Sequence, residues 1–318
     1  MNPRVALALK LLCGGALLAV LFFLVDREAL QTVLSQLNYW VLVSLPVFYL
    51  YTGVRALRWQ CILRAQGVHL PFALANRLYL SGTFLGLISP GRVGEVYRAW
   101  GLLRERKVNA GLGIASVLID RLSDIAVLFP VGCAGWLYLL QQGYGDIRGA
   151  FVVPPFLSPA QIAGKRFLRT QFKRIMRHMP AAVANELPTA YRHFVTSLRS
   201  MSVGLVVQIT LLTLVAIFIY SAHLYFIAQV LGLPLSFLEV VGVLAASAFI
   251  NMLPISLNGL GTRDAFLVAT LPFLGVERPA AFGFALVFLL LFVANTLMAF
   301  PFWLYGKRHT GEATSSAA

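Results

Sequence analysis

The 318-residue sequence has few charged residues. Only 12% of them are Asp, Glu, Lys or Arg, whereas an average soluble domain has about 25%. Hydrophobic residues make up 59% of the chain, and its mean hydropathy is +0.78. A soluble protein of this length could not place so much apolar surface out of water. The composition therefore excludes a soluble enzyme, a secreted disulfide scaffold and a DNA-binding domain, and it indicates an integral membrane protein with several spans.

Cysteines and catalytic motifs are also scarce. The three cysteines, Cys13, Cys61 and Cys133, lie far apart in or beside apolar stretches. An odd, scattered set of this kind predicts neither a disulfide framework nor a metal site. The sequence contains no G-x-S-x-G, H-E-x-x-H, Walker A or D-x-D motif. We therefore expect no metal, no cofactor and no enzymatic activity, and the missing Walker A motif argues against a nucleotide-driven pump.

Acidic residues are outnumbered, with 12 Asp and Glu against 26 Lys and Arg, which gives a formal net charge of +14. In membrane proteins, basic residues collect on the cytoplasmic side and face anionic lipid headgroups. No RNP-like or zinc-ligand pattern supports binding to nucleic acid. Both termini are therefore predicted to be cytoplasmic, from the basic residues beside the first two apolar runs and near the end of the chain: Arg4, Lys10, Arg55, Arg58, Arg64, Lys307 and Arg308.

The apolar runs predict an all-α polytopic membrane protein with six to eight transmembrane helices, since about 20 apolar residues cross a bilayer as a helix. The candidate spans are Val5–Val25, Tyr39–Leu57, Val108–Leu140, Phe151–Ala163, Val203–Leu231, Phe237–Leu253, Ala265–Leu274 and Ala280–Leu304. The stretch Pro71–Pro90 is marginal as a span and predicts a re-entrant hairpin, one of one or two re-entrant or broken helices. We expect residues 1–306 to form a single membrane-embedded domain and residues 307–318 to form a disordered cytoplasmic tail.

Residues 163–200 form a basic segment, with eight Lys or Arg and one acid, Glu186. Between residues 163 and 179, apolar residues recur at helical spacing, and basic residues take the opposite face. This pattern predicts a cytoplasmic amphipathic helix lying against anionic lipid. A solvated connecting helix is the alternative.

Two glycine-containing loops interrupt apolar stretches in the two halves of the chain. Pro90–Glu95 reads P-G-R-V-G-E, and Asn258–Asp264 reads N-G-L-G-T-R-D, so each ends in an arginine and an acid. Paired interrupted segments indicate a transporter's central site and suggest a weak internal repeat. We expect Arg92 and Arg263 to approach each other across a central polar cavity, because separate charges inside a bilayer each need a partner.

The first loop is suited to an anion. Pro90 and Gly91 end one helix, and the next is expected to start near Arg92, so that free N–H groups and a planar guanidinium meet there. The alternative is a capped helix start with a local Arg–Glu pair.

A second cluster contains Asp120 and Asp124, four residues apart on one helix face. Such carboxylates repel unless a cation lies between them or one is protonated. Arg121, Arg92 or Arg263 could supply that cation. The alternative to a substrate site is a buried ion network that holds two helices together.

Other polar and aromatic residues carry weaker signals. His223 lies alone in a candidate span and is expected to bond within the helix bundle. Tryptophans near span ends are interpreted as interfacial anchors: Trp59, Trp100, Trp136 and Trp303. The candidate substrate-binding residues are Ser89, Gly91, Arg92, Gly94, Glu95, Arg98, Asp120, Arg121, Asp124, Asn251, Ser256, Asn258, Gly259, Gly261, Arg263 and Asp264.

Three motifs carry a resemblance to a known family: S-P-G-R-V-G-E-V-Y-R-A-W-G-L, A-S-V-L-I-D-R-L-S-D and L-P-I-S-L-N-G-L-G-T-R-D. From about the first span to Leu304, the chain resembles the lysylphosphatidylglycerol synthase transmembrane-region family, also called the flippase-like domain family. It departs from the family's usual Glu after the last glycine loop, where it has Asp264. In bifunctional members this region is joined to a cytoplasmic aminoacyl-transferase domain. Because the chain ends 14 residues after Leu304, lysyl transfer is not expected.

The resemblance implies a lipid flippase or lipid-binding transporter of a bacterial inner membrane, handling a phospholipid or a polyprenyl-phosphate-linked lipid. Intramembrane arginines would hold the phosphate. One alternative is a membrane transferase acting on a polyprenyl-phosphate, with Asp120 or Glu95 as base. Another is a non-catalytic partner subunit of a glycosyltransferase. The expected partners are membrane lipids and either a second copy of the chain or a glycosyltransferase or other lipid-modifying enzyme.

Overall fold

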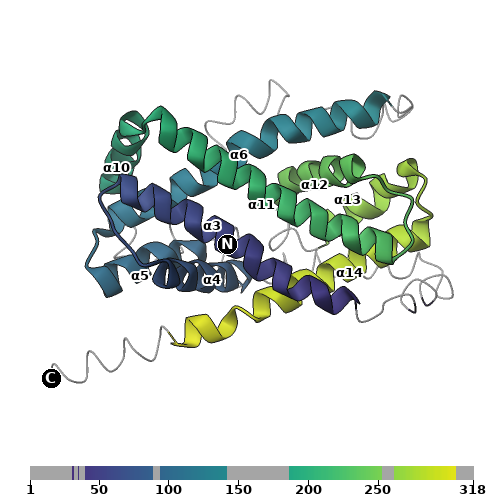
Figure 1. The fold of residues 1–318 in the computed structure, drawn as a ribbon, viewed down its shortest axis with the longest axis horizontal. Helices are drawn as coiled ribbons and strands as arrows, with labels where there is room; N and C mark the ends of the chain where they lie inside the picture. Colours follow the sequence, from purple (N-terminus) through teal and green to yellow (C-terminus); the bar gives the residue numbers. More distant parts are fainter. Residues whose placement is uncertain are drawn as a thin grey trace, which may run out of the picture.

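The computed structural model describes residues 31, 35, 40–88, 94–141, 186–252 and 261–305, and these residues form helices and connecting turns without a strand (Figure 1). The elements are α3 (Trp40–Ala65), α4 (Phe72–Ile88), α5 (Tyr97–Arg106), α6 (Ala110–Gln141), α10 (Leu187–Ser200), α11 (Val203–Val230), α12 (Phe237–Met252), α13 (Thr262–Thr270), the 3-10 helix η3 (Leu271–Leu274) and α14 (Arg278–Leu297). The all-α class expected from the apolar runs is confirmed.

Several predicted spans coincide with helices. Within the described ranges, two helices are long and apolar enough to cross a membrane, Val203–Val230 and Arg278–Tyr305, and Phe237–Ser247 is a shorter apolar helix. The number of crossings therefore stays a prediction, and so does the division into a domain and a tail. Four predicted segments lie outside the described residues: the spans Val5–Val25 and Phe151–Ala163, the amphipathic helix within 163–179, and the tail 307–318.

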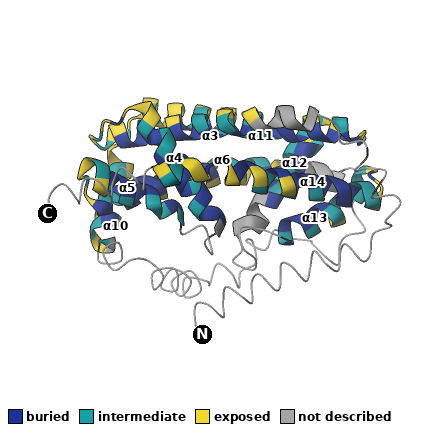
Figure 2. Ribbon diagram, turned by 90° about the horizontal axis from the view of Figure 1, so that it is seen from below, coloured by how far each residue is buried: buried dark blue, intermediate teal, exposed yellow. Residues whose placement is uncertain are grey.

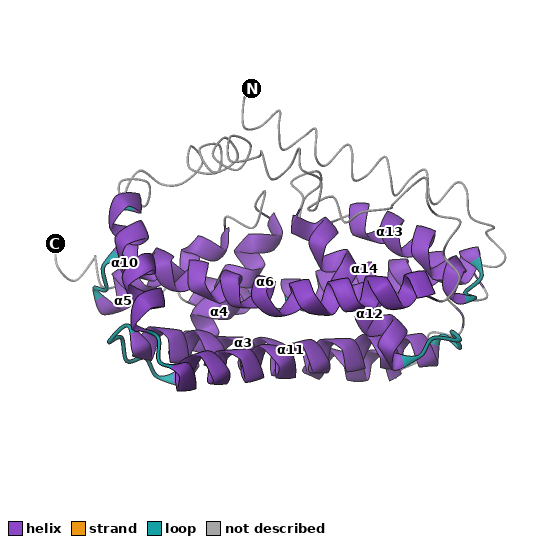
Figure 3. Ribbon diagram, turned by 90° about the horizontal axis from the view of Figure 1, so that it is seen from above, coloured by secondary structure: helices purple, strands orange, loops and turns teal. Residues whose placement is uncertain are grey.

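The helices form two layers. Helices α3 and α11 lie side by side in one layer, and α4, α5, α6, α12, α13 and α14 form the other (Figures 2 and 3). The rings of Tyr51 and Tyr220 stack with centroids 5.1 Å apart, while Ile62 and Ile209 share a cluster at the other end, so α3 and α11 run antiparallel. The outward face of α11 exposes large apolar side chains, including Leu211 and Phe218. This exposure is typical of a helix that faces lipid.

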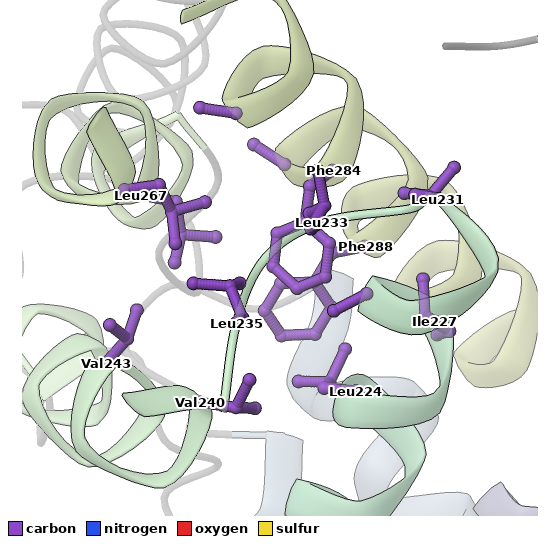
Figure 4. Close-up of a cluster of buried hydrophobic side chains, with 14 of the residues drawn as sticks. Leu224, Ile227, Leu231, Leu233, Leu235, Val240, Val243, Leu267, Phe284 and Phe288 are labelled. Carbon is purple, nitrogen blue, oxygen red and sulfur yellow. The ribbon is translucent and has the colours of Figure 1, made fainter. Parts of the chain in front are cut away.

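The largest apolar cluster joins the end of α11 to α12, α13 and α14. Leu233 and Leu235, from the turn between α11 and α12, lie among Phe284, Phe288 and Leu267 (Figure 4). Lipid tails are as apolar as leucine, so close van der Waals packing, rather than removal of apolar surface from water, holds such helices together in a bilayer.

Helices α4 and α5 form a tight antiparallel hairpin. A β-carbon at Gly94 would lie 2.2 Å from the backbone carbonyl of Leu85, and one at Gly86 would lie 3.1 Å from Cγ of Glu95. The two backbones therefore approach so closely that only glycine fits at Gly94. The described part of the second arm of this helical hairpin begins with a 3-10 turn at residues 94–96, and α5 starts at Tyr97. This packing holds Glu95 and Arg98 against α4 and α6; whether the hairpin is re-entrant stays a prediction.

Candidate functional site

Seven charged side chains from three helices and the turn before α5 meet between the two layers. They form a continuous set of ion pairs, named here the charge cluster: Arg55, Arg58, Glu95, Arg98, Asp120, Arg121 and Asp124. Arg55 and Arg58 come from α3, and Arg98 comes from α5. Glu95 lies in the 3-10 turn before α5, and the other three residues come from α6. Five of the seven are among the candidate residues predicted from the sequence.

Arg58 lies at the centre of the charge cluster, with a fully buried side chain. Its Nε and Nη2 donate to Oδ1 of Asp120 at 3.0 and 2.7 Å, and Nη2 also donates to the backbone carbonyl of Asp120 at 3.1 Å. Its Nη1 donates to Oδ1 of Asp124 at 2.6 Å and to Oγ1 of Thr213 at 2.8 Å. A guanidinium has five N–H donors, so every donor of Arg58 has an acceptor. Arg58 thereby joins α3, α6 and α11.

Asp120 is fully buried and has a second cation. Nη1 of Arg98 donates to its Oδ2 at 2.9 Å, and the Tyr79 hydroxyl contacts the same oxygen at 3.5 Å. The Arg98 guanidinium also lies over the rings of Tyr79 and Trp59, with centroid distances of 4.4 and 5.3 Å. Aromatic faces attract cations, most strongly where water is excluded. Arg98 is therefore held by a carboxylate on one side and by rings on the other.

The Asp124 carboxylate accepts hydrogen bonds from three arginines. Besides Arg58, Nη2 of Arg55 donates to its Oδ2, and Nη1 of Arg121 lies 3.3 Å from that oxygen. Arg121 also donates from Nη2 to Oε2 of Glu95. Charge-assisted bonds of this kind are stronger than neutral ones.

The charge cluster has an excess of positive charge. Among the described residues, its four guanidinium groups face three carboxylates, which leaves one formal positive charge. Arg121 is the most accessible member, with 29% of its side chain exposed, and its buried Nε–H has no hydrogen-bond partner. An unsatisfied buried donor costs free energy. The charge cluster therefore carries a positive charge that could attract an anion, and Arg121 is its most accessible cation.

The charge cluster also lies deep within the span formed by α11. Thr213, which contacts Arg58, is ten residues after the first residue of α11, or about 15 Å along a helix of about 42 Å. The hydrocarbon core takes about 20 helical residues, and every such window within Val203–Val230 contains Thr213. If α11 crosses the membrane, Arg58 and its partners are at the depth of the hydrocarbon core, whatever the helix's exact position.

The expectation that the second span ends at Arg55 and Arg58 was wrong. Helix α3 continues to Ala65, and both arginines are buried within it. The sequence contained a signal for this, because the apolar run resumes after Arg58 with Trp59, Cys61 and Ile62 before the exposed Arg64. The interpretation of Trp59 as an interfacial anchor was also wrong, because it is fully buried and its Nε1 donates to Oγ of Ser116 at 3.0 Å.

The requirement for a cation between Asp120 and Asp124 is confirmed, but Arg58 meets it. Of these two carboxylates, Arg121, one of the three arginines considered for that role, contacts Asp124 alone. Helical spacing showed that the two carboxylates share a face, and it could not show which helix packs there. The buried ion network expected as the alternative is present, and it includes the most accessible arginine as well.

The second loop yields a separate pair. Nε and Nη2 of Arg263 donate to Oδ1 of Asp264 at 3.0 and 2.7 Å, while Asp264 Oδ2 accepts from the N–H of Gly261 at 3.0 Å. The Arg263 guanidinium lies 4.0 Å from the ring centroid of Phe288. Both charged side chains are buried. Asp264 thus caps the start of α13 and fixes Arg263, which supports a structural role for this pair.

Other predicted residues are placed only in part. Gly94 lies in the 3-10 turn before α5, and of Asn251 only the helical backbone is described. His223 is buried, and its Nε2 has no hydrogen-bond partner; the bond expected within the helix bundle stays a prediction. The approach of Arg92 to Arg263 stays a prediction, because six candidate residues lie outside the described residues: Ser89, Gly91, Arg92, Ser256, Asn258 and Gly259.

Within the described ranges, no group of three His, Cys, Asp or Glu side chains is placed to hold a metal ion. No curated protein and no solved structure matches the chain. The family model of the lysylphosphatidylglycerol synthase TM region matches residues 5–298 of the 318. The match covers both glycine-containing loops and the whole charge cluster, and the chain therefore belongs to the lysylphosphatidylglycerol synthase TM region family.

Proposed function

We propose that this protein is a lipid flippase or lipid-binding transporter that holds the phosphate of its lipid at the charge cluster, with Arg121 as the contacting residue. It acts as a polytopic protein of a bacterial inner membrane, with six to eight crossings and both termini in the cytoplasm. It is not itself an enzyme. The lipid is a phospholipid or a polyprenyl-phosphate-linked lipid, since both present the same phosphate chemistry.

The observation that carries this proposal is the unbalanced charge of the charge cluster, which lies at membrane depth if α11 crosses the bilayer. A charged side chain at the centre of a bilayer costs about 2.5 to 3.5 kcal/mol on insertion scales, and the charge cluster keeps one more arginine than its carboxylates neutralise. A purely structural network is expected to balance its charges, because an uncompensated buried charge is destabilising. A phosphate supplies the missing negative charge and accepts a hydrogen bond from the unpartnered Nε–H of Arg121.

Replacing Arg121 with lysine or glutamine is expected to lower lipid retention and transport while the protein still accumulates in the membrane. Lysine keeps the charge but loses the planar two-point contact with phosphate oxygens. The expected loss is about tenfold for lysine and greater for glutamine, since bonds to charged groups contribute about 1.5 to 3 kcal/mol. The measurements are native mass spectrometry of retained lipid and transfer of labelled lipid between leaflets of liposomes.

The matched control is Arg104→Gln on α5, which removes the same charge from an exposed arginine stacked 4.3 Å from the ring centroid of Trp100, outside the charge cluster. The liposomes contain phosphatidylcholine alone, phosphatidylcholine with phosphatidylglycerol, or phosphatidylcholine with a polyprenyl phosphate, so that the two phosphate sources are separated. Retention of phosphatidylglycerol and of the polyprenyl phosphate that is no better than retention of phosphate-free diacylglycerol, added at the same level, contradicts the proposed function. An equal effect of the Arg104 and Arg121 substitutions contradicts the assignment of Arg121.

Topology gives an independent test. The basic segment 163–200 and the residues Lys307 and Arg308 are expected on the cytoplasmic side, since positive charge is retained there. Cysteines introduced at Ser200 and at Thr310, in a background without Cys13, Cys61 and Cys133, should resist a membrane-impermeant thiol reagent in intact cells. They should react after the cells are opened. Efficient labelling of either site in intact cells contradicts the predicted orientation.

A further inference from the structure

Glu95 occupies the position at Arg121 that a bound anion needs. Its carboxylate is buried, and Oε2 accepts from Nη2 of Arg121. The same oxygen lies 3.5 Å from Nη2 of Arg98, and the backbone carbonyl of Glu95 accepts from Nε of Arg98 at 3.4 Å. Glu95 is thus shared between an accessible arginine of α6 and a buried arginine of α5.

The two arginines that contact Glu95 differ in what else holds them. Arg98 has Asp120 at 2.9 Å and two aromatic rings. Arg121 has only a longer contact of 3.3 Å to Asp124, and its Nε–H is unpartnered. A carboxylate and a phosphate offer a guanidinium the same pair of acceptor oxygens. Glu95 and a lipid phosphate are therefore alternative ligands for one side chain.

We propose that Glu95 is a gating residue that competes with the lipid phosphate for Arg121. This inference rests on the proposed function. When phosphate binds Arg121, the Glu95 carboxylate moves onto Arg98, where it keeps a cation; when phosphate leaves, the carboxylate returns. A displaced Glu95 thus keeps a cation as its partner in the membrane. The exchange therefore avoids the free-energy cost of an unpaired buried charge.

The exchange couples lipid binding to the α4–α5 hairpin. Glu95 directly follows Gly94, whose backbone is pressed against Leu85 of α4, and its Cγ lies against Gly86. A shift of the Glu95 side chain toward Arg98 therefore changes its contact with α4 as well as with α6. The arrangement gives the hairpin two states, one with Glu95 on Arg121 and one with phosphate on Arg121.

The test is Glu95→Gln in the full chain, with retention of phosphatidylglycerol measured by native mass spectrometry and leaflet transfer measured in liposomes. Retention is expected to rise about tenfold, within the range usual for coupling between two sites, because the internal competitor has lost its charge. Transfer is expected to slow, because release then lacks the returning carboxylate. A residue with only a structural role would lower stability and both readouts together.

Glu105→Gln is the matched control. Glu105 lies near the end of α5, is partly buried and pairs with Arg77 of α4, outside the charge cluster. Removing its charge alters the net charge of the protein by the same amount, so a general electrostatic effect would appear in both variants. Unchanged or reduced retention in Glu95→Gln relative to Glu105→Gln overturns the gate. The proposed function still stands in that case if the Arg121 substitutions lower lipid retention.

A second measurement on the unaltered protein covers the case in which Glu95→Gln does not fold. Backbone amide hydrogen exchange of residues 94–100 is compared in nanodiscs of phosphatidylcholine with and without phosphatidylglycerol. Displacement of Glu95 should change protection in this segment and leave the middle of α11 unaffected. Identical exchange in both nanodiscs, together with preferential retention of phosphatidylglycerol, overturns the gate alone. Retention of phosphatidylglycerol that is no better than retention of phosphate-free diacylglycerol overturns the proposed function first.

Discussion

Replacing Arg58 with alanine is expected to destabilise the protein by about 3 kcal/mol or more, the range for removing one partner from a buried ion pair. All five N–H donors of Arg58 are engaged, so the substitution removes at least one hydrogen bond from each of Asp120, Asp124 and Thr213. It also removes the cation from between two carboxylates four residues apart. Lysine in its place keeps the charge but has only three donors, and an intermediate loss is expected.

The free energy of unfolding is measured by SDS titration of the purified protein in mild detergent. Arg64→Ala is the control, since Arg64 is an exposed cation near the end of the same helix. It should change stability by less than about 0.5 kcal/mol, as is usual for surface substitutions. Equal effects at the two positions contradict the central role assigned to Arg58. A stabilising effect of Arg58→Ala does the same.

Replacing Gly94 with alanine is expected to open the α4–α5 hairpin and to abolish lipid retention. The added β-carbon would lie 2.2 Å from the backbone carbon and oxygen of Leu85 and 2.7 Å from the backbone nitrogen of Gly86. Backbone atoms cannot turn aside as a flexible side chain can, so the two segments must separate. Overpacking costs about 1 to 3 kcal/mol and occasionally more, and here the separation also pulls Arg98 of α5 away from Asp120 of α6, which takes the charge cluster apart.

Gly204→Ala provides the matched control, because a β-carbon at Gly204 meets no atom within 4 Å. Alanine favours a helix over glycine by up to about 1 kcal/mol, so this variant should be as stable as the parent or slightly more so. Unfolding and lipid retention are measured for both variants side by side. Full lipid retention by Gly94→Ala contradicts the close approach of α4 and α5.

Predictions from periodicity and composition succeeded where they depended on one segment at a time. The span at 203–231 corresponds to α11, and the described part of the stretch 71–90 contains α4. Asp120 and Asp124 were placed on one face of a helix, as the structure shows. Each of these predictions uses only the rise of a helix and the length of apolar chain that a bilayer requires.

Predictions failed where the partner came from a distant segment. Arg58 and Asp120 are 62 residues apart in the chain, and Arg58 and Thr213 are 155 apart. The rule that basic residues mark the cytoplasmic end of a span assigned Arg55 and Arg58 to the surface, because it counts charges along the chain and takes no account of carboxylates on other helices. That rule therefore cannot distinguish a buried arginine from a surface arginine.

The sequence by itself determined that this is an all-helical membrane protein of the lysylphosphatidylglycerol synthase TM region family, and that the acids of α6 need cations. Apolar content, helical spacing and charge repulsion are local properties, so they can be read along the chain. Only the tertiary structure decided that Arg58 neutralises both acids, that the Nε–H of Arg121 has no partner, and that Glu95 lies between Arg121 and Arg98. Ion pairing falls off steeply with distance in space, and distance in space is set by the packing of helices that are far apart in the sequence.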